Sequence, residues 1–84
     1  MTVLTDEIQP GVMAIMTGPL QLEVESPELD MIDAGILDSL TLVQLLVELE
    51  RTFEITVDLQ TVELDSLRTV SSIARLVAEA RIVA

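Results

Sequence analysis

Residues 39–53, SLTLVQLLVELERTF, constrain the fold more than any other segment of the chain. The segment contains neither Gly nor Pro, and its apolar residues recur at helical spacing, so it predicts an amphipathic α-helix. Asp38 precedes it and is the expected N-cap. At about 100° per residue, five apolar side chains fall in one wide stripe, which is the expected core face. These are Leu42, Leu45, Leu46, Leu49 and Phe53.

The same helix carries a second apolar stripe on nearly the opposite side. Ser39 lies beside this stripe, and Glu50 and Glu54 lie along its edge. Because one apolar face is enough to pack on a small core, the second stripe has two interpretations. It is either buried under another short helix or a docking surface, starting at Ser39, that a partner covers transiently. This stripe, the ridge, consists of Leu40, Val43 and Val47.

Helices are also predicted on both sides of this segment. The first covers about residues 3–16, where Pro10 either kinks the helix or marks a late start. Residues 20–37 have broken periodicity and predict a long loop. A short helix is expected near residues 59–63, and a last helix follows Thr69 as N-cap. Its buried face is expected to contain Val70, Ile73, Ala74, Val77 and Ala80.

These segments predict an all-α single domain covering residues 1–84. The formal net charge is −11, which argues against nucleic acid as a partner because phosphate binding needs a cationic surface. The excess lies between Glu23 and Asp65, where twelve acids accompany one base, Arg51. Those acids form either a solvated face or a surface for basic partners.

Neither membrane insertion nor secretion is expected. No apolar run approaches the roughly 18 residues that span a bilayer. Asp6 and Glu7 stand where a secretory signal would carry basic residues. The sequence therefore predicts a cytoplasmic protein.

Two observations argue against catalysis and metal binding by this chain. Ser39 could act as a nucleophile only with a general base, and the sequence contains no His, Lys, Tyr or Cys. An EF-hand loop aligned on Asp30 places Gly35 correctly, but three ligand positions are then unsuitable. Those positions hold Ile32, Ala34 and Thr41. Modification of Ser39 by another enzyme is the better interpretation.

The tetrapeptide LDSL occurs twice, at residues 37–40 and 64–67. The first copy follows Gly35, which permits a tight turn, and it opens the strongest helix. There the helix dipole and the free N–H groups favour a phosphate beside Ser39. The second copy lacks a preceding glycine, so Ser66 is expected in a loop that Leu67 anchors.

Residues 33–55, DAGILDSLTLVQLLVELERTFEI, resemble the phosphopantetheine attachment region of acyl, aminoacyl and peptidyl carrier proteins. The signature of that family is D-S-L after a G-[LI]-[LI]-like turn and before an acidic amphipathic helix. The resemblance extends through residues 56–83 and, loosely, to the first helix. It implies a four-helix bundle of the acyl-carrier-protein type. It also implies that Ser39 receives 4′-phosphopantetheine from coenzyme A and that Asp38 helps to present the serine.

The resemblance further implies a carrier that is not an enzyme. A thiol arm would hold an acyl or aminoacyl group as a thioester and deliver it between enzymes. The expected partners are an Mg²⁺-dependent phosphopantetheinyl transferase, an adenylating ligase or acyltransferase, and downstream acyl-using enzymes. This protein is expected to be a monomer. The partner-contacting residues would be Leu40, Val43, Val47, Glu48, Glu50 and Glu54.

Within the family, the segment TLVQLLVELERTFEI is most similar to D-alanyl carrier proteins and related free-standing aminoacyl carriers. Thr41 and Gln44 stand where carriers of fatty-acid synthesis usually place Asp and Glu. A specialised pathway is therefore expected. The alternative is a small acidic helical adaptor that binds a basic protein without a prosthetic group, but it leaves the position of Ser39 between Asp38 and Leu40 unexplained.

Overall fold

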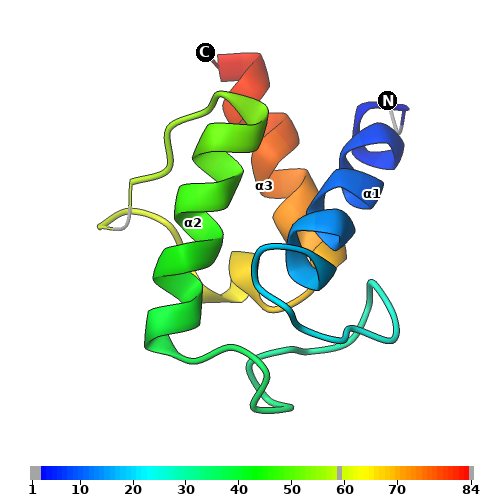
Figure 1. Cartoon of the computed structure of the whole chain (residues 1–84). Coiled ribbons are helices and arrows are strands. Elements are labelled where there is room, and N and C mark those ends of the chain that lie inside the picture. Colours follow the sequence, from blue (N-terminus) through cyan, green and yellow to red (C-terminus); the bar gives the residue numbers. More distant parts are fainter. Residues whose placement is uncertain (1–2, 59, 84) are drawn as a thin grey trace.

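A computed structural model describes residues 3–58 and 60–83, with side chains for residues 8–58 and 60–80. Three α-helices and one turn of 3-10 helix occur in this part of the chain, and it contains no strand (Figure 1). The all-α prediction is confirmed. The elements are α1 (Val3–Thr17), α2 (Ser39–Phe53), η1 (Leu64–Leu67) and α3 (Val70–Val83).

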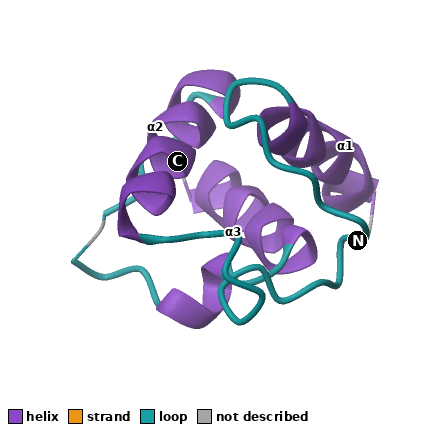
Figure 2. Ribbon diagram, turned by 60° about the horizontal axis from the view of Figure 1, so that its bottom comes forward, coloured by secondary structure: helices purple, strands orange, loops and turns teal. Residues whose placement is uncertain are grey.

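The helix α3 lies between α1 and α2 in both views of the ribbon (Figures 1 and 2). Its most extensive helix–helix contact is with α1. Thr69 caps α3, since its hydroxyl accepts the N–H of Ser72 at 3.0 Å and the Ser72 hydroxyl accepts the N–H of Thr69 at 3.1 Å. This reciprocal pair satisfies two N–H groups at the helix start, and it confirms the predicted N-cap.

The core is aliphatic and draws on all four elements. On α2, Leu45, Leu46 and Leu49 are buried, while Leu42 and Phe53 pack half-buried against them, so the predicted core stripe is confirmed. No buried polar or charged residue occurs among the described side chains. The other buried residues are Ile8, Val12, Ile15, Met16, Met31, Leu37, Ile55, Leu67, Val70, Ile73, Ala74, Val77 and Ala78.

Helix α1 runs continuously through Pro10, so a late start at this residue is wrong. Proline lacks the N–H that would bond to the preceding turn, and this leaves α1 dependent on its packing. Gly11 supports that packing, because a Cβ there would lie 2.9 Å from the ring carbon Cζ of Phe53. The missing side chain lets the only aromatic ring of the chain rest directly on α1.

The short helix does not lie at residues 59–63, as predicted, but at Leu64–Leu67. Residues 60–62 form a turn and a bend, while Leu59 lies outside the described residues. The turn is built on Asp58, whose carboxylate accepts the N–H of Gln60 at 2.9 Å and whose carbonyl accepts that of Val62 at 2.9 Å. The second LDSL, expected as a loop, is therefore the helical turn. The four-helix count is not confirmed, because the fourth element is a single 3-10 turn.

Residues 18–38 connect α1 to α2 without a helix. Main-chain bonds attach this connection to α3 and to the residues just before it, since Met31 N–H donates to the carbonyl of Arg68 and Ser71 N–H to that of Pro27. No helix in the described part of the chain is long and apolar enough to cross a membrane.

Candidate functional site

Ser39 is exposed as the first residue of α2. Before it, Asp38 has extended backbone geometry, with φ −112° and ψ −176°, and its Oδ1 accepts the N–H of Thr41 at 2.8 Å. The predicted N-cap is confirmed. The first N–H groups of a helix have no partner within the helix, and together with the dipole they favour a phosphate beside Ser39. An exposed hydroxyl at this place therefore fits the attachment of a phosphopantetheine.

The turn before Ser39 fixes where α2 begins. Gly35 has φ +77°, and nothing lies within 4 Å of a Cβ built there, so the conformation alone requires glycine. The carbonyl of Met31 accepts the N–H groups of Ile36 and Leu37 at 2.9 and 3.1 Å. Met31 and Leu37 are both buried. The chain therefore passes from the buried core at Leu37 to the solvent-exposed surface at Ser39.

The cap holds the pKa of the Asp38 carboxyl below its ordinary value, chiefly because the carboxylate accepts the N–H of Thr41. A lowered folded-state pKa stabilises the fold above the unfolded pKa, and this stabilisation is lost as the pH falls through the folded pKa. We expect Asp38→Asn, which still caps, to have a shallower fall in the free energy of unfolding below roughly pH 4 than the wild type. Urea unfolding at neutral and acid pH measures this difference. Glu25→Gln, at an exposed acid, is the control, and an unchanged slope in Asp38→Asn would contradict the assignment.

The ridge is exposed on α2. The exposed fractions are 69% for Leu40, 45% for Val43 and 53% for Val47. No element of the described chain buries these side chains, so burial under another short helix is the wrong interpretation. An apolar strip that starts beside Ser39 and faces solvent is typical of a surface that binds a partner.

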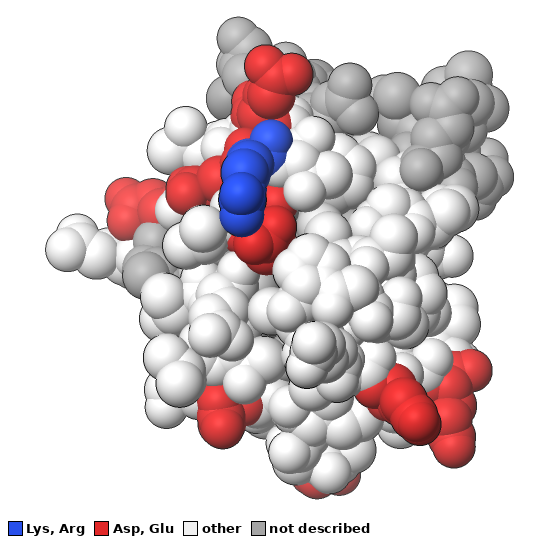
Figure 3. All heavy atoms as spheres, viewed as in Figure 1, with Lys and Arg blue, Asp and Glu red and all other residues white. Residues whose placement is uncertain are grey.

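The three acids predicted to contact partners differ in their surroundings. Glu48 pairs with Arg51 at 2.8 Å and its side chain is only 18% exposed. Glu50 accepts the N–H of Val57 at 2.8 Å and so holds the segment that follows α2. Glu54 is exposed at the end of the helix with φ +55°. Acidic side chains outnumber basic ones on the face of Figure 3: one group lies around the single blue side chain, near the end of α2, and others lie along the lower edge.

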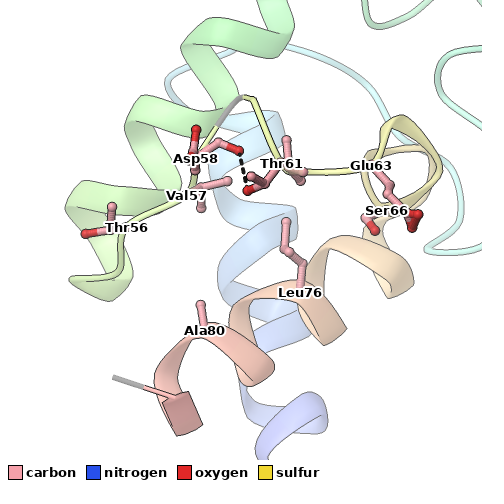
Figure 4. Close-up of a pocket in the computed structure, with 9 residues that line it drawn as sticks. Thr56, Val57, Asp58, Thr61, Glu63, Ser66, Leu76 and Ala80 are labelled. Atoms are coloured by element: carbon pink, nitrogen blue, oxygen red, sulfur yellow. Dashed lines mark hydrogen bonds between the residues drawn. The ribbon is translucent and has the colours of Figure 1, made fainter.

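A hollow of about 340 Å³ lies between the segment after α2 and helix α3 (Figure 4). None of the residues predicted for the site lines it. Ser66 of the second LDSL lies at its edge, half-buried, in contrast to the exposed Ser39. Sequence patterns give no signal for this hollow, because it arises from how the segment packs on α3. Its lining is Thr56, Val57, Asp58, Thr61, Val62, Glu63, Ser66, Leu76 and Ala80.

The sequence also gives no signal for the surroundings of Arg68. Its guanidinium pairs with Asp30 at 3.1 Å and with Asp65 at 2.7 Å, so it joins the turn before Ser39 to η1. Residues 30 and 68 are far apart in the sequence and belong to no shared periodic pattern. Within the described residues, no group of three or more His, Cys, Asp or Glu side chains could hold a metal ion.

Comparison with known proteins identifies the family. A family model described as "Phosphopantetheine attachment site" matches residues 11–77. The chain belongs to this family. The prediction of a phosphopantetheine-binding carrier family is confirmed, and with it 4′-phosphopantetheine as the group that the family attaches. The matched residues include both LDSL copies, so the match by itself does not choose between Ser39 and Ser66.

D-alanyl carrier proteins are among the relatives of this family member. Those of Streptococcus pyogenes serotype M5 (strain Manfredo), serotype M49 (strain NZ131) and serotype M1 are each 48% identical over 50 residues. The aligned residues make up 60% of this chain and 63% of each relative, so the similarity covers less than two thirds of their length.

Proposed function

We propose that this protein carries 4′-phosphopantetheine on Ser39 and passes thioester-bound aminoacyl or acyl groups between enzymes. One observation carries the choice of serine: within the matched region, Ser39 is exposed at the start of α2, while Ser66 is half-buried in a single 3-10 turn. A transferase must reach the hydroxyl oxygen directly, and the first serine is the more exposed of the two.

The chain's own residues present the serine and leave the chemistry to other enzymes. Ser39 Oγ would form a phosphodiester bond to the phosphopantetheine of coenzyme A while the pyrophosphate bond of coenzyme A breaks and adenosine 3′,5′-bisphosphate leaves. The transferase would accept the proton of the hydroxyl, because this chain contains no His, Lys, Tyr or Cys and the neighbouring Asp38 carboxylate is held by the N–H of Thr41. When bound, the group supplies a thiol that holds cargo as a thioester. Asp38 keeps the first turn of α2 in place for the reaction.

The ridge is the proposed contact for these enzymes. Leu40, Val43 and Val47 offer apolar area beside the attachment point, and Glu54 offers an exposed charge to a basic partner surface. Glu48 and Glu50 would contribute to the surface potential while keeping their contacts within the chain. The proposed partners are a phosphopantetheinyl transferase, an adenylating ligase or acyltransferase, and an enzyme that takes the cargo.

The relatives support an aminoacyl cargo in a specialised pathway. They are named D-alanyl carrier proteins, and a small amino acid needs no deep cavity in the carrier. Because coenzyme A is the donor, we place the modification in the cytoplasm. An adaptor without a prosthetic group gains no support, since the family is defined by phosphopantetheine attachment.

Intact mass tests the proposal. Purified protein incubated with coenzyme A, Mg²⁺ and a broad-specificity phosphopantetheinyl transferase is expected to gain one phosphopantetheine. Peptide mapping should place the gain on the fragment that contains Ser39 and not on the one that contains Ser66. If the transferase modifies a known carrier in parallel but leaves this protein unchanged, the proposed function is wrong.

A further inference from the structure

Arg68 holds the turn before Ser39 through both its side chain and its main chain. Its guanidinium nitrogen Nη1 donates to Asp30 at 3.1 Å and 3.3 Å, one distance for each carboxylate oxygen. Its carbonyl accepts the N–H of Met31 at 2.7 Å. Two successive residues at the start of the turn are therefore attached to one residue of the distant segment before α3.

This attachment continues to the residue that precedes the N-cap of α2. The carbonyl of Met31 accepts the N–H of Leu37 at 3.1 Å, and Leu37 lies two residues before Ser39. Within the turn, Asp30 Oδ1 also accepts the N–H of Asp33 at 2.9 Å. The position of Ser39 thus depends on a short series of contacts that begins at Arg68.

Arg68 is itself fixed from the other side. Its Nε donates to Asp65 of η1 at 2.7 Å. The pKa of Asp30 is lowered, first by the N–H of Asp33 and also by the charge of Arg68, and the pKa of Arg68 is raised by Asp65 and Asp30. Asp30 and Arg68 are therefore both charged near neutral pH. Because the side chains are about one-third or more exposed, these ion pairs add little to global stability and can instead define local geometry.

We propose that Arg68 is a positioning residue for Ser39: through Asp30 and Met31 it keeps the turn at residues 30–37 in the conformation that presents the serine to the transferase. This inference rests on the proposed attachment at Ser39. It also gives the second LDSL a role, since η1 supplies Asp65 and buried Leu67 to hold Arg68 in place.

Two matched variants separate positioning from a general loss of charge. Asp30→Asn and Asp65→Asn each remove one carboxylate partner of Arg68, but only Asp30 belongs to the turn. We expect Asp30→Asn to raise the KM of the transferase for this protein about fivefold with unchanged kcat, because fewer molecules hold the competent turn. Asp65→Asn is expected to raise the KM by a clearly smaller factor, because Arg68 then loses its bond to η1 but keeps its bonds to Asp30 and Met31. Equal KM values in the two variants would overturn the inference.

A double variant shows whether the effect passes through the ion pair. If Arg68 and Asp30 act together, Asp30→Asn combined with Arg68→Met has a KM no higher than Arg68→Met alone. Multiplied effects in the double variant would mean that the transferase contacts Asp30 directly, which contradicts positioning by Arg68.

Amide hydrogen exchange tests positioning without the transferase. The N–H groups of Met31 and Leu37 should exchange faster in Asp30→Asn than in Asp65→Asn, while amides in the middle of α2 should not change. Unchanged exchange at both sites contradicts the inference. If wild type gains no phosphopantetheine, the proposed function is wrong even when this exchange difference appears, so the two failures are distinguishable.

Discussion

Replacing Ser39 with alanine is expected to abolish phosphopantetheine attachment completely. The phosphodiester bond needs the hydroxyl oxygen, and neither adjacent residue can replace it, since Asp38 carries a carboxylate and Leu40 a hydrocarbon side chain. The variant should fold as the wild type does, because the Ser39 side chain is exposed and does not pack in the core. An exposed substitution of this kind usually changes stability by less than about 0.5 kcal/mol. Intact mass after incubation with coenzyme A and the transferase gives the result.

Ser66→Ala is the matched control, because the same tetrapeptide surrounds both serines. This variant should gain one phosphopantetheine as wild type does. Circular dichroism and urea unfolding would show that both variants are folded. Retained modification in Ser39→Ala together with loss in Ser66→Ala would reverse the assignment and make η1 the attachment site.

The sequence predicts α2 and its surroundings well because several local signals agree there. Asp38 caps the helix, the leucines follow the helical period, and no Gly or Pro interrupts the segment. The start of α3 is similar, since Thr69 and Ser72 satisfy each other's N–H groups. Where the cap and the periodicity specify the same helix, tertiary packing has little left to decide.

The sequence predicts the middle of the chain less well because tertiary contacts decide it. Local propensity favours a helix at residues 59–63, but the N–H groups of Gln60 and Val62 bond to Asp58 in a turn instead. The 3-10 turn forms later, where Leu67 can be buried. Pro10 is a similar case, since packing against the ring of Phe53 supports a helix that a local rule would have started later.

Charge patterns located the acidic surface but not the contacts of individual acids. The sequence does not distinguish Glu48 and Glu50 from Glu54 as partner-contacting acids, yet the first two are engaged by Arg51 and by the Val57 N–H. The sequence also does not predict the ion pair between Arg68 and Asp30, because two residues so far apart in the sequence share no periodic pattern. The resemblance identified the serine, whereas only the packed chain shows what holds it in place.

The two apolar faces of α2 should respond very differently to truncation. Leu49→Ala is expected to lower the free energy of unfolding by about 2–5 kcal/mol, because Leu49 is fully buried and the substitution leaves a cavity. A domain of 84 residues is stable by only about 4–13 kcal/mol, so this loss is a large fraction of the total. Urea unfolding followed by circular dichroism measures it.

Val47→Ala on the ridge is the control, two residues earlier on the same helix. Its side chain is 53% exposed, and alanine has the higher helix propensity, so the free energy of unfolding should change by less than about 0.5 kcal/mol. The proposed function adds that this variant should load more slowly even though it is fully folded, because the ridge then presents less apolar area. Equal losses of stability in the two variants would mean that both faces are buried in solution. In that case the ridge would be part of the core, and it could not be the surface that binds partner enzymes.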